Sequence, residues 1–222
     1  MAEPRAQPAL FFDFDNTVTR GDVLDRVIER FSVSEAWREW ETLWQQGRMS
    51  TVECLTRQVG GLRVAPEVLF AFLEHVEIDP HFARIVAWAS EHGTPLRILS
   101  DNFKPLIEAI LDRHGLRTVA VIANELAFDR DRLEPRFPWR DPACTRCAHC
   151  KARHLRVSAA RPRVFVGDGL SDLCPSLVAE EVFAKDSLAE TLSRRRIAFR
   201  GYKALDEVLA WLEAYEHRLL SA

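Results

Sequence analysis

Residues 10–22, LFFDFDNTVTRGD, contain the feature that decides the fold. Three apolar residues run directly into Asp13, and Asp15 and Thr17 follow at alternate positions. A short apolar run of this kind is typical of a strand buried in a parallel sheet. A buried carboxylate is costly unless it is paired, protonated or bound to a cation. Two of them here therefore indicate either a strand end that reaches solvent or a reaction centre.

The pattern of the remaining chain places this strand in an α/β fold. Apolar runs predict strands that alternate with helices in the later part of the chain, at residues 96–100, 118–123, 163–167, 182–185 and 197–200, with a hairpin over 126–140. Residues 22–78 differ, because their spacing predicts helices without an intervening strand. Alternation of this kind indicates a Rossmann-like parallel sheet covered by helices. We predict a catalytic core of residues 1–21 and 79–222, with a helical cap of residues 22–78 inserted after the first strand.

Composition excludes several classes of protein. The chain has 222 residues, 47% of them apolar, which is enough for a large core, and its net charge of −3 gives no support for a nucleic-acid partner. No apolar run approaches the roughly 20 residues that span a bilayer, and the apolar segment near the N-terminus is too short for a secretory signal. Five cysteines, an odd number, do not suggest a disulfide framework. We expect a cytoplasmic protein without a membrane partner.

Three predicted strands end in polar residues. The first leads into Asp13, the second into Ser100 and Asp101, and a later one into Asp168 and Asp172. In open parallel sheets, ligands bind outside the carboxyl ends of the strands, so these residues are expected to converge on one crevice. A cluster of carboxylates cannot stay ionised without a cation, and oxygen ligands favour Mg²⁺.

This set of motifs resembles the haloacid dehalogenase superfamily, in its subfamily with a helical cap after the first motif. That family carries a D-x-D-x-T motif, a Ser or Thr at the end of a second strand, a Lys, and an acidic G-D-G-x-x-D motif. The matching positions, in order, are Asp13-Phe-Asp15-Asn-Thr17, Ser100, Lys151 and Gly167-Asp168-Gly169-Leu-Ser-Asp172.

The resemblance implies a role for each motif residue. Asp13 would attack phosphorus and form an aspartyl-phosphate, Asp15 would act as general acid and base, and Lys151 would neutralise charge. The implied Mg²⁺ ligands are Asp13, Asp15 (through its backbone carbonyl), Asp168 and Asp172, the last of which holds either Lys151 or a water on the metal. The implied substrate-binding residues are Thr17, Ser100, Asp101 and Asp22, of which Thr17 and Ser100 would either hold phosphate or position the first loop. Asp22 has an equally good interpretation as the N-cap of a helix.

Shorter segments resemble one branch of this superfamily. ILSDNF, ANEL, CTRCAHCK and FVGDGLSDLCP are similar to the phosphatases of phosphoethanolamine, phosphocholine and pyridoxal phosphate, and to the enol-phosphate phosphatase of methionine salvage. Phosphoserine phosphatase is a more distant relative, since it has a Glu where this chain has Asp22. The predicted function is a Mg²⁺-dependent phosphomonoesterase acting on a small phosphorylated metabolite. The alternatives are a phosphotransferase of the same fold and a non-catalytic Zn-containing binding protein.

A cluster of cysteines and a cluster of tryptophans each allow two interpretations. Cys144, Cys147 and Cys150, with His149 and His154 nearby, either bind a structural Zn²⁺ or are reduced cysteines that pack near the site. The tryptophans at helical spacing are interpreted as the core of the cap, or else one of them holds a cationic substrate group; they are Trp37, Trp40 and Trp44.

Overall fold

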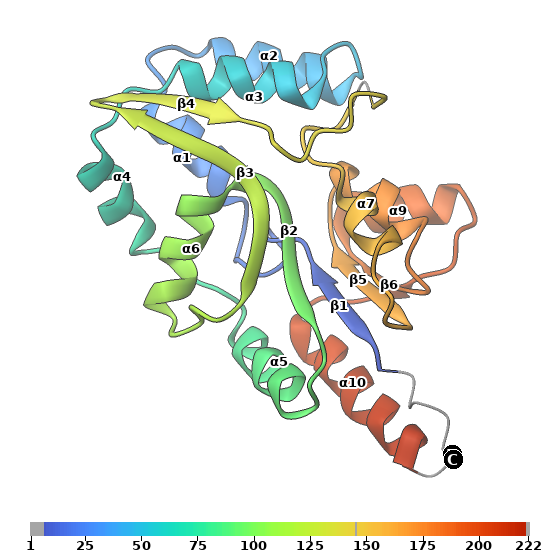
Figure 1. The fold of residues 1–222 in the computed structure, drawn as a ribbon. Helices are drawn as coiled ribbons and strands as arrows, with labels where there is room; N and C mark the ends of the chain where they lie inside the picture. The colour runs from blue at the N-terminus through green and yellow to red at the C-terminus, as the bar shows by residue number, and fades with distance from the viewer. Residues whose placement is uncertain (1–6, 145, 221–222) are drawn as a thin grey trace. The chain divides into compact units, whose positions relative to one another are not determined.

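A computed structural model describes residues 7–144 and 146–220 (Figure 1). Contacts group the chain into two units. The first contains the chain up to residue 20, residues 78–98 and the chain from residue 151; the second contains residues 21–77 and 99–150. The sequence placed 99–150 in the core, whereas the contacts group it with the helical block, and the predicted boundaries of core and cap stay a prediction.

The first unit is built on parallel strands. Its strands are β1 (Ala9–Phe12), the start of β2 (Leu96–Phe103), β5 (Arg163–Gly167), β6 (Glu181–Ala184) and β7 (Arg200–Gly201). They are hydrogen-bonded in the order β2-β1-β5-β6-β7, and each of these four pairs is parallel. Its helices are α5 (Pro80–Glu91), α7 (Lys151–Arg156), the 3₁₀ turn η1 (Leu170–Asp172), α8 (Leu173–Ser176), α9 (Asp186–Arg194) and α10 (Leu205–Leu220).

The second unit contains the helical block and a hairpin. Its helices are α1 (Val23–Phe31), α2 (Ala36–Gln45), α3 (Thr51–Gly60), α4 (Pro66–Leu73) and α6 (Lys104–Arg113). Its strands are the rest of β2, β3 (Ala120–Asp129) and β4 (Arg132–Arg136), and β3 pairs with β4 in antiparallel register. In Figure 1, α2 and α3 lie side by side. Within this unit the strand order is β4-β3-β2.

The first strand is the centre of the core of its unit. All four residues of β1 have no exposed surface, as expected for a strand with neighbours on both edges and helices on both faces. Phe12 packs edge-to-face on Phe82 of α5, with ring centroids 5.4 Å apart. Asp79 caps α5 through the His81 N–H and also accepts a hydrogen bond from the Leu205 N–H, so one carboxylate fixes the starts of α5 and α10. These contacts hold the carboxyl end of β1 in a rigid frame.

The predicted α/β class with a parallel sheet is confirmed, with three local differences. The predicted strand over 118–123 and the first arm of the hairpin form one strand, β3, because Glu125–Asp129 pair with β4. The predicted strand over 197–200 is almost absent: Ile197 and Phe199 instead pack on the apolar cluster beneath α9, which leaves only two residues of β7 paired. The pattern of residues 150–160, CKARHLRVSAA, also predicts a helix, and the helix that forms there, α7, ends at Arg156. In the part of the chain that the structure describes, none of the helices is long and apolar enough to cross a membrane.

Candidate active site

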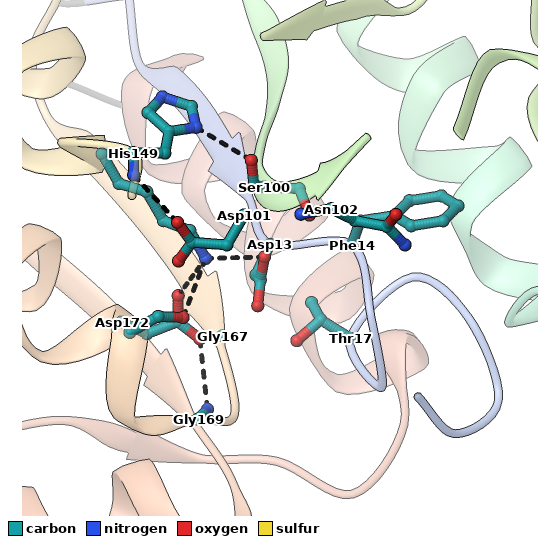
Figure 2. Close-up of polar contacts among 12 residues, drawn as sticks. Asp13, Phe14, Thr17, Ser100, Asp101, Asn102, His149, Gly167, Gly169 and Asp172 are labelled. Carbon is teal, nitrogen blue, oxygen red and sulfur yellow. Dashed lines mark hydrogen bonds and ion pairs between the residues drawn. The ribbon is translucent and has the colours of Figure 1, made fainter. Parts of the chain in front are cut away.

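Lys151 joins two carboxylates inside the first unit. Asp13 follows β1, Lys151 begins α7, and Asp172 ends η1, so three separate segments meet here. Lys151 Nζ donates to Asp13 Oδ1 and to Asp172 Oδ1, each at 2.7 Å, and to Ser171 Oγ at 3.2 Å (Figure 2). All three charged side chains are buried. Ion pairs this short and this dry fix the orientation of the Asp13 carboxylate.

The glycine-rich turn after β5 is closed by Asp172. Its Oδ2 accepts hydrogen bonds from the backbone N–H groups of Asp168 and Gly169, at 3.0 and 3.1 Å. A Cβ atom at Gly167 would lie 2.5 Å from the same oxygen, so the turn requires a glycine at that position. The expected contact of Asp172 with Lys151 is therefore present, and the side chain also shapes the turn that carries Asp168.

Asp168 is oriented by the loop that follows Asp13. Thr17 Oγ1 donates to Asp168 Oδ1 at 3.0 Å, and Asn16 Nδ2 donates to Asp168 Oδ2 at 2.9 Å. Asn16 takes a left-handed backbone conformation, with φ of 51°, which asparagine tolerates better than most residues. Behind this pair, the buried Tyr202 hydroxyl lies 3.4 Å from Thr17 Oγ1. Thr17 thus positions a carboxylate; its predicted contact with substrate stays a prediction.

The electrostatics of this cluster favour a bound cation. Burial, and then the neighbouring Asp172, raise the pKa of Asp13 well above its usual value, against the opposing effect of Lys151. Burial, and then Asp172, also raise the pKa of Asp168 to about 6. Oxygens of Asp13, Asp168 and Asp172 lie within 4.8 Å of one another. One lysine does not balance three carboxylates, so the residues present fit a divalent cation such as Mg²⁺.

Ser100 and Asp101 belong to a cluster in the second unit. Asp101 Oδ1 accepts a hydrogen bond from the His149 backbone N–H at 2.9 Å, and the Ser100 carbonyl oxygen lies 2.9 Å from His149 Nδ1 (Figure 2). Asn124 Nδ2 donates to the Asp101 carbonyl at 2.6 Å. Asp101 therefore anchors the cysteine-containing loop to the end of β2. The predicted substrate contacts of Ser100 and Asp101 stay predictions.

The cysteine loop does not assemble a zinc site in the described structure. Among the residues described, the acidic trio of the first unit is the group of three or more side chains whose ligand atoms come within 4.8 Å of one another. The three cysteines of the loop, Cys144, Cys147 and Cys150, do not form such a group, although the Cys147 N–H donates to Cys144 Sγ at 3.4 Å. In the described structure, none of the five cysteines is in a disulfide. A structural Zn²⁺ is therefore not supported.

The cap residues singled out in the sequence have local roles. Asp22 Oδ1 accepts a hydrogen bond from the Asp25 N–H at 2.8 Å, so it is the N-cap of α1, one of its two interpretations. The tryptophans of α2 are half-buried rather than fully buried. Trp44 Nε1 donates to Thr51 Oγ1 at 2.9 Å, which connects α2 to α3.

Sequence reasoning missed two residues of the site. Asn16 lies inside the D-x-D-x-T motif, and its amide contacts the motif aspartate 152 positions away, a pairing that only the fold reveals. Tyr202 follows a two-residue strand and carries no motif of its own. A tyrosine at the predicted carboxyl end of a strand was the signal that could have found it.

Comparisons with known proteins agree with this site. The model of the haloacid dehalogenase-like hydrolase family matches residues 10–174. A 2-hydroxy-3-keto-5-methylthiopentenyl-1-phosphate phosphatase of Brevibacillus brevis is 26% identical, over 95% of this chain and 97% of the relative. The Pdp3-interacting factor 1 of Schizosaccharomyces pombe is 24% identical, over 92% of this chain and 94% of the relative.

Solved structures share the fold. A substrate-bound phosphoserine phosphatase superposes with a TM-score of 0.70 at 17% identity, over 94% of this chain and 99% of that one. A family hydrolase from Salmonella enterica serovar Typhi gives 0.72 at 19% identity, over 93% of this chain and 73% of that one. With a family model that covers the acidic motifs and most of the chain, the protein belongs to the haloacid dehalogenase-like hydrolase family and is a phosphatase.

Proposed function

We propose that Asp13 is the nucleophile of a Mg²⁺-dependent phosphomonoesterase, and that the reaction passes through an aspartyl-phosphate on this residue. The observation that carries the proposal is the buried Lys151 ammonium held between Asp13 and Asp172. Burial raises the pKa of Asp13, and a protonated carboxyl group does not attack phosphorus. Lys151 opposes that shift, so it favours the ionised form of the carboxylate and fixes its orientation.

Mg²⁺ would be held by Asp13, Asp168 and the backbone carbonyl of Asp15. When bound, the ion supplies positive charge that screens the repulsion between the carboxylate and the phosphate group. Thr17 and Asn16 support this set by holding both oxygens of Asp168. Asp172 pairs with Lys151 and accepts the hydrogen bonds that close the glycine-rich turn. It would therefore support the residues that hold the ion.

Asp15 is proposed as the general acid and base. It would give a proton to the leaving oxygen of the substrate and then take one from the water that releases phosphate from Asp13. Its position two residues after the nucleophile, at the carboxyl end of β1, supports this role. Phosphoryl transfer needs mainly positioning and charge stabilisation, which this set of groups can supply.

The favoured substrate is a small enol-type sugar phosphate. The support is the near full-length similarity to bacterial 2-hydroxy-3-keto-5-methylthiopentenyl-1-phosphate phosphatases. Phosphoserine is less favoured, since phosphoserine phosphatase structures are only 16–21% identical and Asp22, which stands where that family has a Glu, caps α1. The odd number of cysteines, five, does not suggest a disulfide framework, and we propose a cytoplasmic location.

The test is phosphate release from a panel of phosphomonoesters, with Mg²⁺ and with chelator. The panel contains the enol-phosphate, phosphoserine, phosphoethanolamine, phosphocholine and pyridoxal phosphate. We expect Mg²⁺-dependent release that Asp13→Asn abolishes and that the exposed matched control Asp129→Asn leaves unchanged. Release by folded Asp13→Asn at the wild-type rate would overturn the assignment of the nucleophile. Transfer of phosphate to an added alcohol in place of water would show that the phosphotransferase alternative is correct.

A further inference from the structure

A cavity lies in the first unit, at the carboxyl ends of β6 and β7. Its volume is about 550 Å³, within the range of sites for small ligands. The lining comes from the start of α9 and the segment that leads into α10, and consists of Ala184, Lys185, Asp186, Ala189, Gly201, Tyr202, Lys203 and Glu207. None of these residues has a role in the mechanism proposed above.

Two lysines on the wall of this cavity lack an anionic partner. In the described part of the chain, neither Lys185 Nζ nor Lys203 Nζ lies within 4.0 Å of a carboxylate oxygen. Lys185 Nζ lies 5.5 Å from the centre of the Tyr202 ring, so an aromatic face, not a carboxylate, holds it. Ammonium groups on the wall of a cavity, without an ion pair, are available to an anionic ligand.

Lysine is rare in this chain, which makes their position informative. Of thirty basic residues, only four are lysines: Lys104, Lys151, Lys185 and Lys203. The other twenty-six are arginines, which form most of the ion pairs among the described residues. Lysine is a compact point charge that suits phosphate and carboxylate groups. One lysine joins the catalytic carboxylates, and two line this cavity.

The two carboxylates of the cavity are already engaged. Asp186 Oδ2 accepts a hydrogen bond from Asn16 Nδ2 at 3.0 Å, and Glu207 Oε1 accepts one from the Lys203 N–H at 2.7 Å. The nine-residue helix α9 begins here without a side-chain cap, so its first N–H groups add partial positive charge. The wall therefore offers an anion two ammonium groups without a carboxylate partner and a helix N-terminus, and it offers hydroxyl or ammonium groups two carboxylates.

We propose that this cavity binds a small anionic metabolite, with a phosphate or carboxylate group and at least one hydrogen-bond donor, at a site separate from the catalytic carboxylates. The site touches the groups that hold Asp168. Asp186 shares Asn16 with it, and Tyr202 contacts Thr17. A ligand bound in the cavity would therefore lie next to the groups that hold Asp168, the proposed metal ligand, without contacting a proposed catalytic residue.

Lysine acetylation tests the proposal directly. The full-length protein, in chelator, is treated with an acetylating ester, and peptide mass spectrometry measures the rate at each lysine. With inorganic phosphate or malate at about tenfold excess over the dissociation constant, Lys185 and Lys203 should react roughly ten-fold more slowly. Lys104, exposed on α6, is the internal control and should be unaffected, and neutral glycerol should protect none of them. Equal rates at Lys185 and Lys203 with and without both anions overturn the proposal, as does equal slowing at Lys104.

A matched pair of variants gives an independent measurement. Lys185→Gln/Lys203→Gln should show a smaller rise in Tm with phosphate than Lys104→Gln does, because a ligand stabilises the state that binds it. Equal rises in the two variants would overturn the proposal. Both measurements monitor binding, so their failure would leave the phosphatase assignment as it stands.

Discussion

Replacement of Lys151 by Met should destabilise the protein through the two carboxylates it leaves behind. The Lys151 side chain is 1% exposed and makes two 2.7 Å contacts with buried carboxylates. A hydrogen bond to a charged group contributes about 1.5–3 kcal/mol, and removal of one partner of a buried ion pair costs about 3–5 kcal/mol. Since Met keeps most of the apolar volume, we expect a loss of about 4 kcal/mol near pH 7.

The loss should depend on pH. Burial already raises the pKa of Asp13, and without Lys151 that pKa rises further. A carboxyl group whose pKa is higher in the folded state destabilises folding when it is ionised, and this cost fades as pH falls and the group takes a proton. The difference in unfolding free energy between Lys151→Met and wild type should therefore be smaller at pH 5 than at pH 7.5.

Urea unfolding, followed by tryptophan fluorescence in chelator at both pH values, measures this difference. The double variant Lys151→Met/Asp172→Asn should recover part of the loss, because it removes one of the stranded charges. A loss below about 1 kcal/mol, or a loss equal at pH 5 and pH 7.5, would refute the argument that Lys151 compensates buried charge.

Three further predictions rest on neighbouring contacts. Gly167→Ala would place a methyl group 2.5 Å from Asp172 Oδ2, so it should cost about 1–3 kcal/mol in urea unfolding, and a cost near zero would contradict the close approach. Mg²⁺ should raise Tm of the wild type but not of Asp168→Asn. Half-saturation should need more Mg²⁺ as pH falls below about 6, because protons compete with the ion for the Asp168 carboxylate, whose pKa burial raises to about 6. The hydrogen bond to Glu216 raises the pKa of His92, so the pair stabilises the fold below about pH 6.5, and this contribution is lost as pH rises through the raised pKa. His92→Gln should remove that part of the Tm–pH profile. An unchanged profile would show that the pair does not contribute to stability.

The sequence predicted the elements that depend on local pattern. The apolar run into Asp13 predicted β1, and the turn chemistry of Gly167–Asp172 predicted the acidic end of β5, because both signals lie within a few residues. The hydrogen bond from Asn16 to Asp168 and the contact of Tyr202 with Thr17 join positions far apart in the sequence, so no local pattern predicts them. The strand predicted over residues 197–200 was wrong although its signal is local, because the apolar side chains of this segment pack on the cluster beneath α9.

Pattern also left alternatives that only contacts could separate. A polar residue before an apolar helix serves equally as a cap or as a ligand contact; Asp22 caps α1, and its predicted substrate contact stays a prediction. Cysteine spacing permits metal binding, but the three sulfur atoms of the loop are not gathered around one point in the described structure. The grouping of Asp13, Asp168 and Asp172, by contrast, was predictable, because parallel strands bring their carboxyl ends to one edge of the sheet.

The central claim is that Asp13 carries the phosphoryl group, and chemical trapping tests it most directly. The enzyme is mixed with Mg²⁺ and its best phosphomonoester from the panel, quenched, and reduced with borohydride, which converts an aspartyl-phosphate to homoserine. Peptide mass spectrometry then locates the reduced residue. The account predicts homoserine at Asp13, dependent on both Mg²⁺ and substrate. Homoserine at another aspartate, or turnover with no reduced residue, would contradict it.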